Sequence, residues 1–198
     1  MKNIAIIAAT VALFATASFA GVIGDTNSEK LSFSKDNLTF ALGATNEQLD
    51  TVSAGVNVLP TTLAGFDGVG NVTLAYNDNT DQLAATFGYT ASKTFGKVTA
   101  YGTLAETYTK TSHAADGAWS FQPKAGLSLA AADKLSVYTE VGNNFWNAAN
   151  GYSNEGQYAT IGVNYTVADK VTLNPTVTRT FNTAADSTNL GLNVNIAF

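Results

Sequence analysis

Apolar side chains recur at every second position along most of this 198-residue chain. The last nine residues show the pattern most clearly, because Leu190, Leu192, Val194, Ile196 and Phe198 alternate with small or polar residues. That spacing places the apolar side chains on one face of a β-strand and the others on the opposite face. Beyond residue 20, no segment has the apolar length of a transmembrane helix. The chain is therefore expected to be all-β.

A short phrase repeats along the chain and divides it into hairpins. Each copy opens with a polar turn residue and continues with alternating apolar and hydroxyl side chains. The copies begin at Asp36, Asn71, Lys97, Asp133 and Asp169. Each is followed by a second alternating run, and these runs cover roughly residues 49–59, 82–92, 119–129, 157–167 and 188–198. Five hairpins predict ten strands, or eight if the weak first hairpin lies outside the sheet.

The two faces of these strands differ in chemistry. One face is bulky and apolar, as at Leu38, Phe40 and Leu42, and the other is mostly Thr, Ser, Asn, Gly and Ala. A soluble β-sandwich would bury the apolar face, whereas a membrane barrel would turn it toward lipid, and the alternation fits both. Charged residues make up only 13% of the chain, about half the usual share, so a soluble fold would have few charges to cover its surface. The composition favours the barrel.

Both ends of the chain carry features of an exported protein. Residues 1–20 have the organisation of a secretory signal peptide, with Lys2, an apolar run over residues 4–14 and small residues at the cleavage positions. At the other end, the alternating strand that finishes on an aromatic residue resembles the C-terminal signal of bacterial outer-membrane β-barrels. This resemblance implies that the barrel-assembly machinery reads Leu192, Val194, Ile196 and Phe198.

The chain as a whole resembles small bacterial outer-membrane barrels of the porin-like kind. The resemblance implies a closed antiparallel up-and-down transmembrane barrel over residues 31–198, preceded by the signal peptide and by a polar periplasmic tail at residues 21–30. An even number of strands would leave both termini in the periplasm, with short periplasmic turns and longer external loops. Residues 60–70 would then form an unusually long turn. Pro123 and Pro175 fall inside strands and predict β-bulges, because proline removes a donor from the ladder.

The inner face decides whether a barrel of this size conducts. Most residues predicted there are small and polar, which leaves room for water and favours a narrow aqueous pore. The alternative is a barrel closed by inward tyrosines and ordered water. The residues predicted to line the pore are Lys124, Glu140, Tyr101, Tyr138, Tyr158, Asn164, Asn174 and Asn193.

Lys124 and Glu140 are opposite charges on that inner face, in strands joined by a short turn. Pairing Leu129 with Leu135 would place the two charges directly opposite and predicts a salt bridge in the lumen. A register slip of one residue would separate them. Acidic residues gather in or beside the predicted external loops, and an acidic mouth predicts a weak preference for cations. They are Glu47, Asp50, Asp78, Asp81, Asp116, Glu155 and Asp186.

Other functions have less support in the residues. The absence of cysteine excludes disulfides and thiolate metal sites, and a formal net charge of −5 argues against nucleic-acid binding. The single histidine, His113, lies near Asp116 in a predicted external loop without the motif of an outer-membrane barrel enzyme. We therefore expect no catalysis, no metal and no cofactor.

The expected location is the bacterial outer membrane, and the expected partners are its lipids, the barrel-assembly machinery and ions or small solutes. No feature of the sequence indicates an oligomeric state. The second function that fits the sequence is a non-conducting structural or adhesive barrel that acts as a surface receptor through the external loops around residues 109–118 and 146–158. These loops are rich in Asn, Gly, Ser and aromatic residues, which suit binding surfaces.

Overall fold

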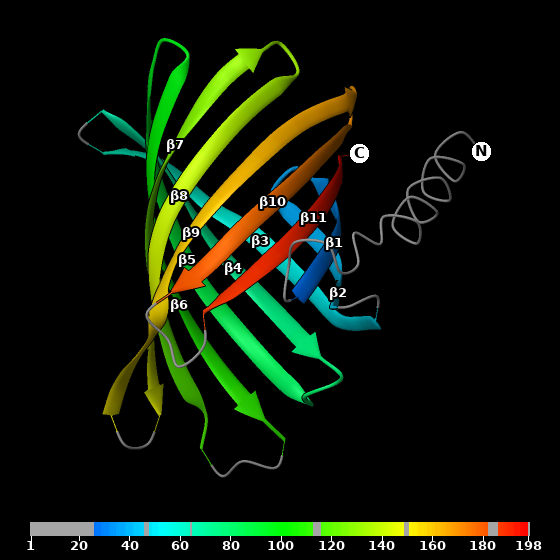
Figure 1. Cartoon of the computed structure of the whole chain (residues 1–198), viewed down its shortest axis with the longest axis vertical. Helices are drawn as coiled ribbons and strands as arrows, with labels where there is room; N and C mark the ends of the chain where they lie inside the picture. Colours follow the sequence, from blue (N-terminus) through cyan, green and yellow to red (C-terminus); the bar gives the residue numbers. More distant parts are fainter. Residues whose placement is uncertain are drawn as a thin grey trace.

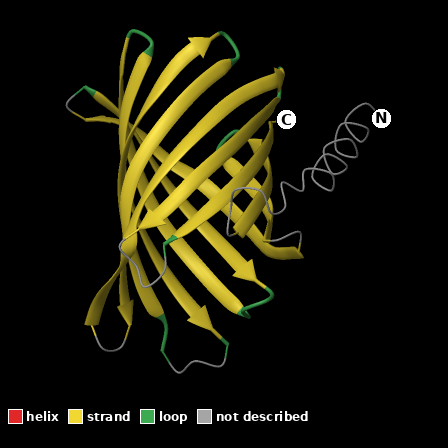
Figure 2. Cartoon of the chain, viewed as in Figure 1, coloured by secondary structure: helices red, strands yellow, loops and turns green. Residues whose placement is uncertain are grey.

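The computed structural model describes residues 26–45, 48–63, 65–112, 116–148, 151–181 and 186–197. Within these ranges every regular element is a β-strand (Figure 2). The strands are β1 (Thr26–Lys35), β2 (Leu38–Thr45), β3 (Gln48–Leu63), β4 (Phe66–Asn77), β5 (Gln82–Phe95), β6 (Val98–Thr111), β7 (Ala118–Ala132), β8 (Leu135–Ala148), β9 (Gly151–Ala168), β10 (Val171–Phe181) and β11 (Ser187–Ala197). Across the same ranges, no helix with the length and apolarity of a membrane span occurs.

The eleven strands form one closed barrel (Figure 1). From β2 to β11, each strand pairs antiparallel with the next. β1 pairs antiparallel with β2 and parallel with β11, so that Leu31 lies beside both Leu42 and Val194. An odd number of up-and-down strands leaves the first and the last running in the same direction, so the pair that closes the wall is parallel. The predicted all-β closed barrel is confirmed, and the β-sandwich is excluded.

The strand number differs from both predicted values. The ten predicted strands correspond to β2–β11, and the additional strand is β1. β1 begins at Thr26, so the first strand starts inside the segment 21–30 that the sequence assigned to a periplasmic tail. Only Leu31 and Phe33 are bulky and apolar in β1, and the repeated phrase is missing there. The alternation in β1 is therefore too short to distinguish a strand from a polar tail.

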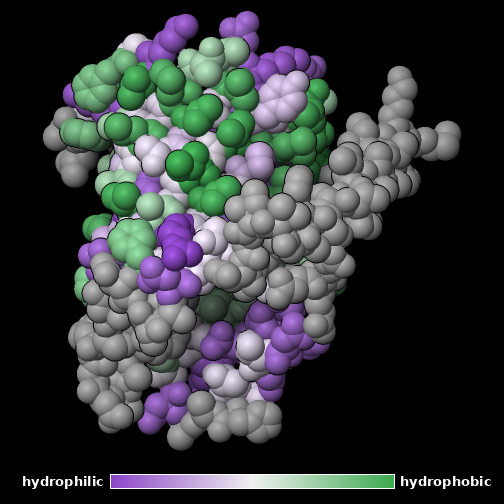
Figure 3. Space-filling view, viewed as in Figure 1, coloured by the Kyte–Doolittle hydropathy of each residue, from purple (hydrophilic) through white to green (hydrophobic). Residues whose placement is uncertain are grey.

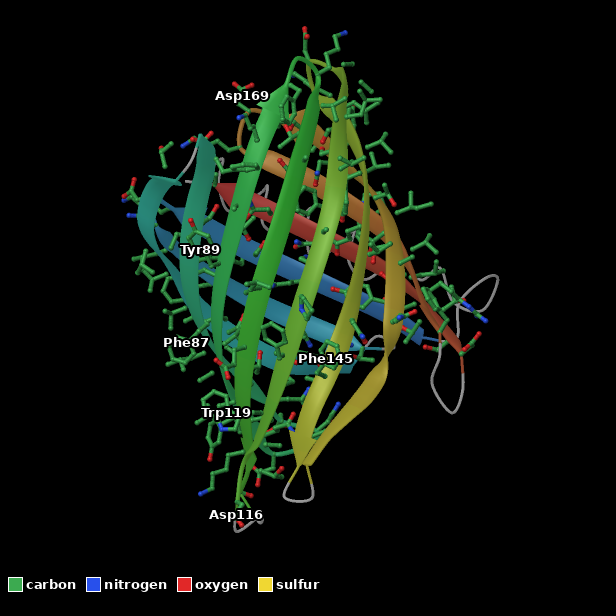
Figure 4. The ribbon with its side chains drawn as sticks, turned by 90° about the vertical axis from the view of Figure 1, so that its left-hand side faces the viewer. Phe87, Tyr89, Asp116, Trp119, Phe145 and Asp169 are labelled. Carbon is green, nitrogen blue, oxygen red and sulfur yellow. The ribbon has the colours of Figure 1, made fainter. Side chains whose placement is uncertain are left out.

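The two ends of the barrel differ in their connections. The turn end holds the short turns that precede β2, β4, β6, β8 and β10, and the loop end holds the connections that precede β3, β5, β7, β9 and β11. Figure 4 labels Asp169 at the turn end and Asp116 at the loop end. Because β1 runs parallel to β11, its first residue, Thr26, lies toward the loop end beside Asn189. The predicted placement of both chain ends on one side is therefore wrong for the described residues.

The connection between β3 and β4 is much shorter than the turn predicted at residues 60–70. The two strands continue as a hairpin until Leu63 pairs with Phe66. The register shifts between Val58 and Pro60, which places this proline next to an irregularity in the ladder. Such irregularities are among the few places in a sheet that accept a residue without an N–H group.

The prolines in β7 and β10 do not cause the bulges predicted from the sequence. β7 keeps one register with β8 on both sides of Pro123, and β10 keeps one register with β9 on both sides of Pro175. In each case the pairing with one neighbouring strand is interrupted at the proline and at the residue before it. The missing hydrogen bond is therefore tolerated without an extra residue.

A side-chain amide replaces the missing donor beside Pro175. In a regular ladder, the residue at this position would donate its N–H to the carbonyl of Val163 on β9. Instead, Asn174 Nδ2 donates to that carbonyl oxygen at 2.9 Å. The backbone acceptor therefore stays hydrogen-bonded inside the wall, where an unpaired carbonyl group would be costly.

The barrel is apolar outside and polar inside. Each strand from β2 to β9 carries at least one bulky apolar residue that is more than half exposed: Phe40, Val52, Leu74, Leu83, Leu104, Leu127, Val141 and Ile161. Figure 3 shows hydrophobic side chains gathered toward the turn end of one face, with hydrophilic side chains at the edges. A band of this kind is unfavourable in water and suits the hydrocarbon core of a membrane.

We predict that Asn174→Ala lowers the free energy of unfolding by about 1–3 kcal/mol, because the carbonyl of Val163 loses its donor. The same replacement should cost less in a Pro175→Ala background, where a backbone N–H is available again. Urea unfolding of the four proteins in lipid vesicles, analysed as a double-mutant cycle, measures the difference. An equal cost in both backgrounds would show that the amide does not substitute for the N–H group.

Candidate pore lining

The inner face is built from residues that alternate with the outward apolar ones. On neighbouring strands, inward hydroxyl groups pair across the sheet: Thr86 with Thr107 at 2.8 Å and Thr90 with Thr103 at 2.9 Å between their Oγ1 atoms. These pairs satisfy their hydrogen bonds along the wall and add no charge. The strands β5 and β6 therefore present a neutral, polar surface to the lumen.

The predicted ion pair between Lys124 and Glu140 is confirmed. Lys124 Nζ lies 3.1 Å from Glu140 Oε2, and the two side chains are 33% and 12% exposed. The register that predicted the pair is wrong by two residues, because Leu129 pairs with Val137. An even shift keeps every side chain on its own face, so the charges now meet diagonally across β7 and β8.

The inward tyrosines lie against the wall rather than across the lumen. Tyr101 is the cross-strand neighbour of Gly126, Tyr138 of Gly162 and Tyr158 of Gly142. A Cβ atom built on any of these glycines would lie 2.3–2.5 Å from the nearest atom of its tyrosine ring. Each ring therefore covers the bare backbone of the neighbouring strand, in a space that exists only because the position is glycine.

The tyrosine hydroxyl groups extend these contacts to strands further round the wall. The hydroxyl of Tyr101 on β6 donates to Glu140 Oε2 on β8 at 3.1 Å. The hydroxyl of Tyr138 on β8 donates to Asn174 Oδ1 on β10 at 3.3 Å. Glu140 therefore holds both a cation and a phenol, which satisfies a carboxylate placed inside the barrel.

Asparagines form the adjoining part of the inner face, on β9, β10 and β11. Asn174 Nδ2 donates to Asn164 Oδ1 at 2.9 Å, which joins β10 to β9. Ser32 Oγ on β1 lies 3.3 Å from Asn193 Oδ1 and 3.2 Å from Asn195 Oδ1, which joins the first strand to the last. The structure thus places all eight residues predicted to line the pore on inner strand positions, and the hydrogen bond between Tyr138 and Asn174 joins those around Glu140 to the amides.

Two cavities of about 410 and 510 Å³ lie along the amide side of the lumen. Lys30 and Asn193 line both of them, and Asp50 lines the first. Neither charge was predicted from the sequence to face the lumen. Lys30 belongs to the strand that was not predicted, although the alternation of Leu31 and Phe33 with serines was a signal for it. Asp50 was assigned to an external loop.

Aromatic side chains form a girdle on the outside of β6, β7 and β8 near the loop end. Tyr108 and Trp119 contact each other with ring centroids 5.0 Å apart, and Phe121 and Phe145 with centroids 6.3 Å apart. Figure 4 shows Trp119 and Phe145 in this region, between the middle of the barrel and Asp116. Rings at this level are typical of the boundary between hydrocarbon and headgroups. Glu106, on the outer face beside Phe121, is the one carboxylate in this girdle among the residues described.

Three of the four proposed assembly residues lie on the last strand, β11. Leu192, Val194 and Ile196 pack on the outer face against Leu31 of β1 and Val171 of β10. Phe198 lies outside the described residues, as does His113, the one histidine. Among the described residues, no three His, Cys, Asp or Glu side chains group closely enough to hold a metal ion.

Comparison with known proteins finds matches to solved structures at low identity. No protein-family model and no curated protein matches the chain. OmpT of Vibrio cholerae, expressed in the outer membrane, is 14% identical with a TM-score of 0.45, and the match covers 75% of this chain and 52% of that one. OmpT lacking loop L8 is 13% identical with a TM-score of 0.47, over 80% of this chain and 59% of that one. The chain thus spans little more than half the length of these outer-membrane proteins.

Because both TM-scores are below 0.5, these similarities carry no argument about function. The class of the protein follows from its own geometry: a closed wall, an apolar outer face with an aromatic girdle, and a polar inner face. Those features define a membrane-spanning β-barrel.

We predict that Gly162→Ala destabilises the barrel by about 1–3 kcal/mol, because the new methyl group collides with the ring of Tyr138. Gly102→Ala is the matched control, since the nearest atom to a Cβ there is 3.8 Å away. Tyr138→Ala should remove most of the penalty of the first substitution. The temperature at which the folded form disappears in a heat-modifiability gel ranks the variants. A penalty for Gly162→Ala that persists without the ring would contradict the packing described here.

Proposed function

We propose that this chain forms a narrow aqueous pore in a bacterial outer membrane, for passive diffusion of ions and small solutes. The observation that carries the proposal is the inner face: its side chains are mostly small and polar, its three tyrosines pack over glycines of neighbouring strands, and two cavities remain beside Lys30 and Asn193. Residues 1–20 would be removed on export, and β11, with Leu192, Val194, Ile196 and Phe198, would be the segment that the assembly machinery binds.

The size of the barrel is compatible with a water-filled passage. Eleven strands spaced about 4.8 Å apart and tilted by about 40° close at a backbone radius of about 11 Å. Barrels of eight strands are usually filled by their own side chains, whereas sixteen strands enclose a wide channel. A barrel between these limits conducts only if its inward residues are small, as most of them are here.

The charges at the loop end support a weak preference of the pore for cations. We place the turn end in the periplasm and the loop end outside, because outer-membrane barrels have short periplasmic turns and longer external loops. Among the described residues, the loop end carries Asp78, Asp81, Asp116 and Asp186 against Lys110 and Arg179, and Arg179 is paired with Asp186 at 3.2 Å. A mouth with an excess of carboxylates raises the local concentration of cations.

The direct test is single-channel recording of the purified mature protein in a planar lipid bilayer. We expect discrete conductance steps and, under a salt gradient, a reversal potential that favours cations. Replacing Asp78 and Asp116 with asparagine should shift that potential toward zero, because two charges leave the mouth. The matched control replaces Asp133 and Asp169, which lie in turns at the opposite end of the barrel.

Two outcomes would contradict the proposal in different ways. Folded, inserted protein that never conducts would refute the pore and favour the structural or adhesive barrel, which deletion of residues 147–154 tests through cell or phage attachment. Discrete steps whose selectivity is unchanged by the loop substitutions would keep the pore and refute the acidic mouth as the source of cation preference.

A further inference from the structure

A bulge in β3 turns Asp50 into the barrel. Gly43 of β2 pairs with Thr51, but the next residue, Ala44, pairs with Leu49, so Asp50 is an extra residue in the ladder. Leu49 and Val52 are 61% and 54% exposed on the outer face although they are three positions apart. Strict alternation would have placed Asp50 on that apolar face. Bulges commonly redirect one side chain at the rim of a barrel or beside a functional site.

The redirected carboxylate is buried and faces a cavity. Asp50 is 8% exposed and lines the lumen cavity of about 410 Å³. Its Oδ1 accepts a hydrogen bond from Thr51 Oγ1 at 2.9 Å, and Thr51 Oγ1 in turn accepts one from Asn77 Nδ2 at 3.1 Å. These contacts hold the carboxylate group in place without neutralising it.

Lys30 provides a cation in the same cavity. It lies on β1 with Gly43 of β2 on one side and Asn193 of β11 on the other, both at inner positions. Its side chain is exposed within this space, and it lines the second cavity as well. Among the described residues, neither Lys30 nor Asp50 takes part in an ion pair, whereas Lys124 and Glu140 neutralise each other.

The two charges project into the cavity from strands that are not neighbours in the wall. They lie on β1 and β3, with only Gly43 between them on β2, so their backbones are about 10 Å apart. Glycine adds no side chain to that interval. A small molecule held between the two side chains could form one charge-assisted hydrogen bond, about 2.8 Å long, with each of them. Ser53, Thr73 and Thr176 add hydroxyl groups around the same cavity.

From this arrangement, we propose that the lumen binds small zwitterions, such as free α-amino acids, between Lys30 and Asp50. The carboxylate of the ligand faces Lys30 and its ammonium group faces Asp50. A ligand with only a negative charge would be attracted by Lys30 and repelled by Asp50. A ligand with only a positive charge would be attracted by Asp50 and repelled by Lys30. The site defines the class of solute that the proposed pore passes. Its role in transport rests on the proposed function.

Binding can be measured without conduction. The folded full-length mature protein in detergent micelles is titrated with L-alanine, propionate and ethylammonium, which are similar in size and differ in charge, by saturation-transfer NMR. We expect alanine to bind roughly tenfold more tightly than either single-charge analogue, since it alone makes both charge-assisted contacts. Lys30→Gln and Asp50→Asn should each weaken alanine binding by about the same factor.

Two control variants separate the site from general changes in charge. Lys35→Gln, on the same strand at the turn end, and Asp133→Asn, in the turn between β7 and β8, should bind alanine as the wild type does. Lys30→Glu adds an independent test that does not disturb the bulge: with two carboxylates in the cavity, ethylammonium should become the preferred ligand of the three.

The outcomes distinguish this inference from the proposed function. Alanine binding no tighter than propionate binding, or unchanged in Lys30→Gln, overturns the zwitterion site. A barrel that conducts in a bilayer but shows no alanine binding refutes the site and leaves the pore. A barrel that binds alanine through Lys30 and never conducts refutes the pore and leaves a zwitterion-binding receptor.

Discussion

The fold depends on pairing every backbone N–H and C=O group of the wall, because lipid offers no alternative partner. Hairpins achieve this automatically for β2–β11, where each strand follows its neighbour in the chain. The remaining problem is the seam, where one edge of β2 and one edge of β11 need a partner. β1 fills it with an antiparallel ladder on one side and a parallel ladder on the other. Bacterial single-chain barrels usually close with an even number of strands, so this parallel seam is the distinctive feature of the wall.

The seam also determines what faces the lumen. Because β1 is part of the wall, Lys30 and Ser32 become inner residues beside Asn193 and Asn195. A ten-stranded wall closed by β2 and β11 would be narrower and would lack this cation. The lumen therefore combines a neutral amide and hydroxyl surface with two charge centres: one closed, at Glu140, and one open, between Lys30 and Asp50. Its glycines leave the inner wall without side chains at positions that the tyrosine rings cover.

Much of the wall was predictable because alternation is a local property. Ten strands, their inward and outward faces and the contact between Lys124 and Glu140 follow from a period of two, and an error of two residues in register leaves the faces unchanged. Features that depend on one residue or on distant partners were not predictable. β1 has too few apolar residues to stand out, and the bulge at Asp50 has no mark in the sequence. The ladder gap at Pro175 needed no bulge because Asn174, one residue earlier, supplies the donor.

The most direct test of this account is disulfide crosslinking across the seam. The natural chain has no cysteine, so only introduced pairs can react. Ser32 lies beside Asn195 on one side and Ala41 on the other, all in one row of the wall. In native membranes, cysteines at positions 32 and 195 should crosslink under mild oxidation, because neighbouring strands bring Cα atoms within disulfide range. Cysteines at 41 and 195 should not, since β1 separates them by about 10 Å. The reverse result would mean that β2 closes the barrel against β11 and that β1 is not part of the wall.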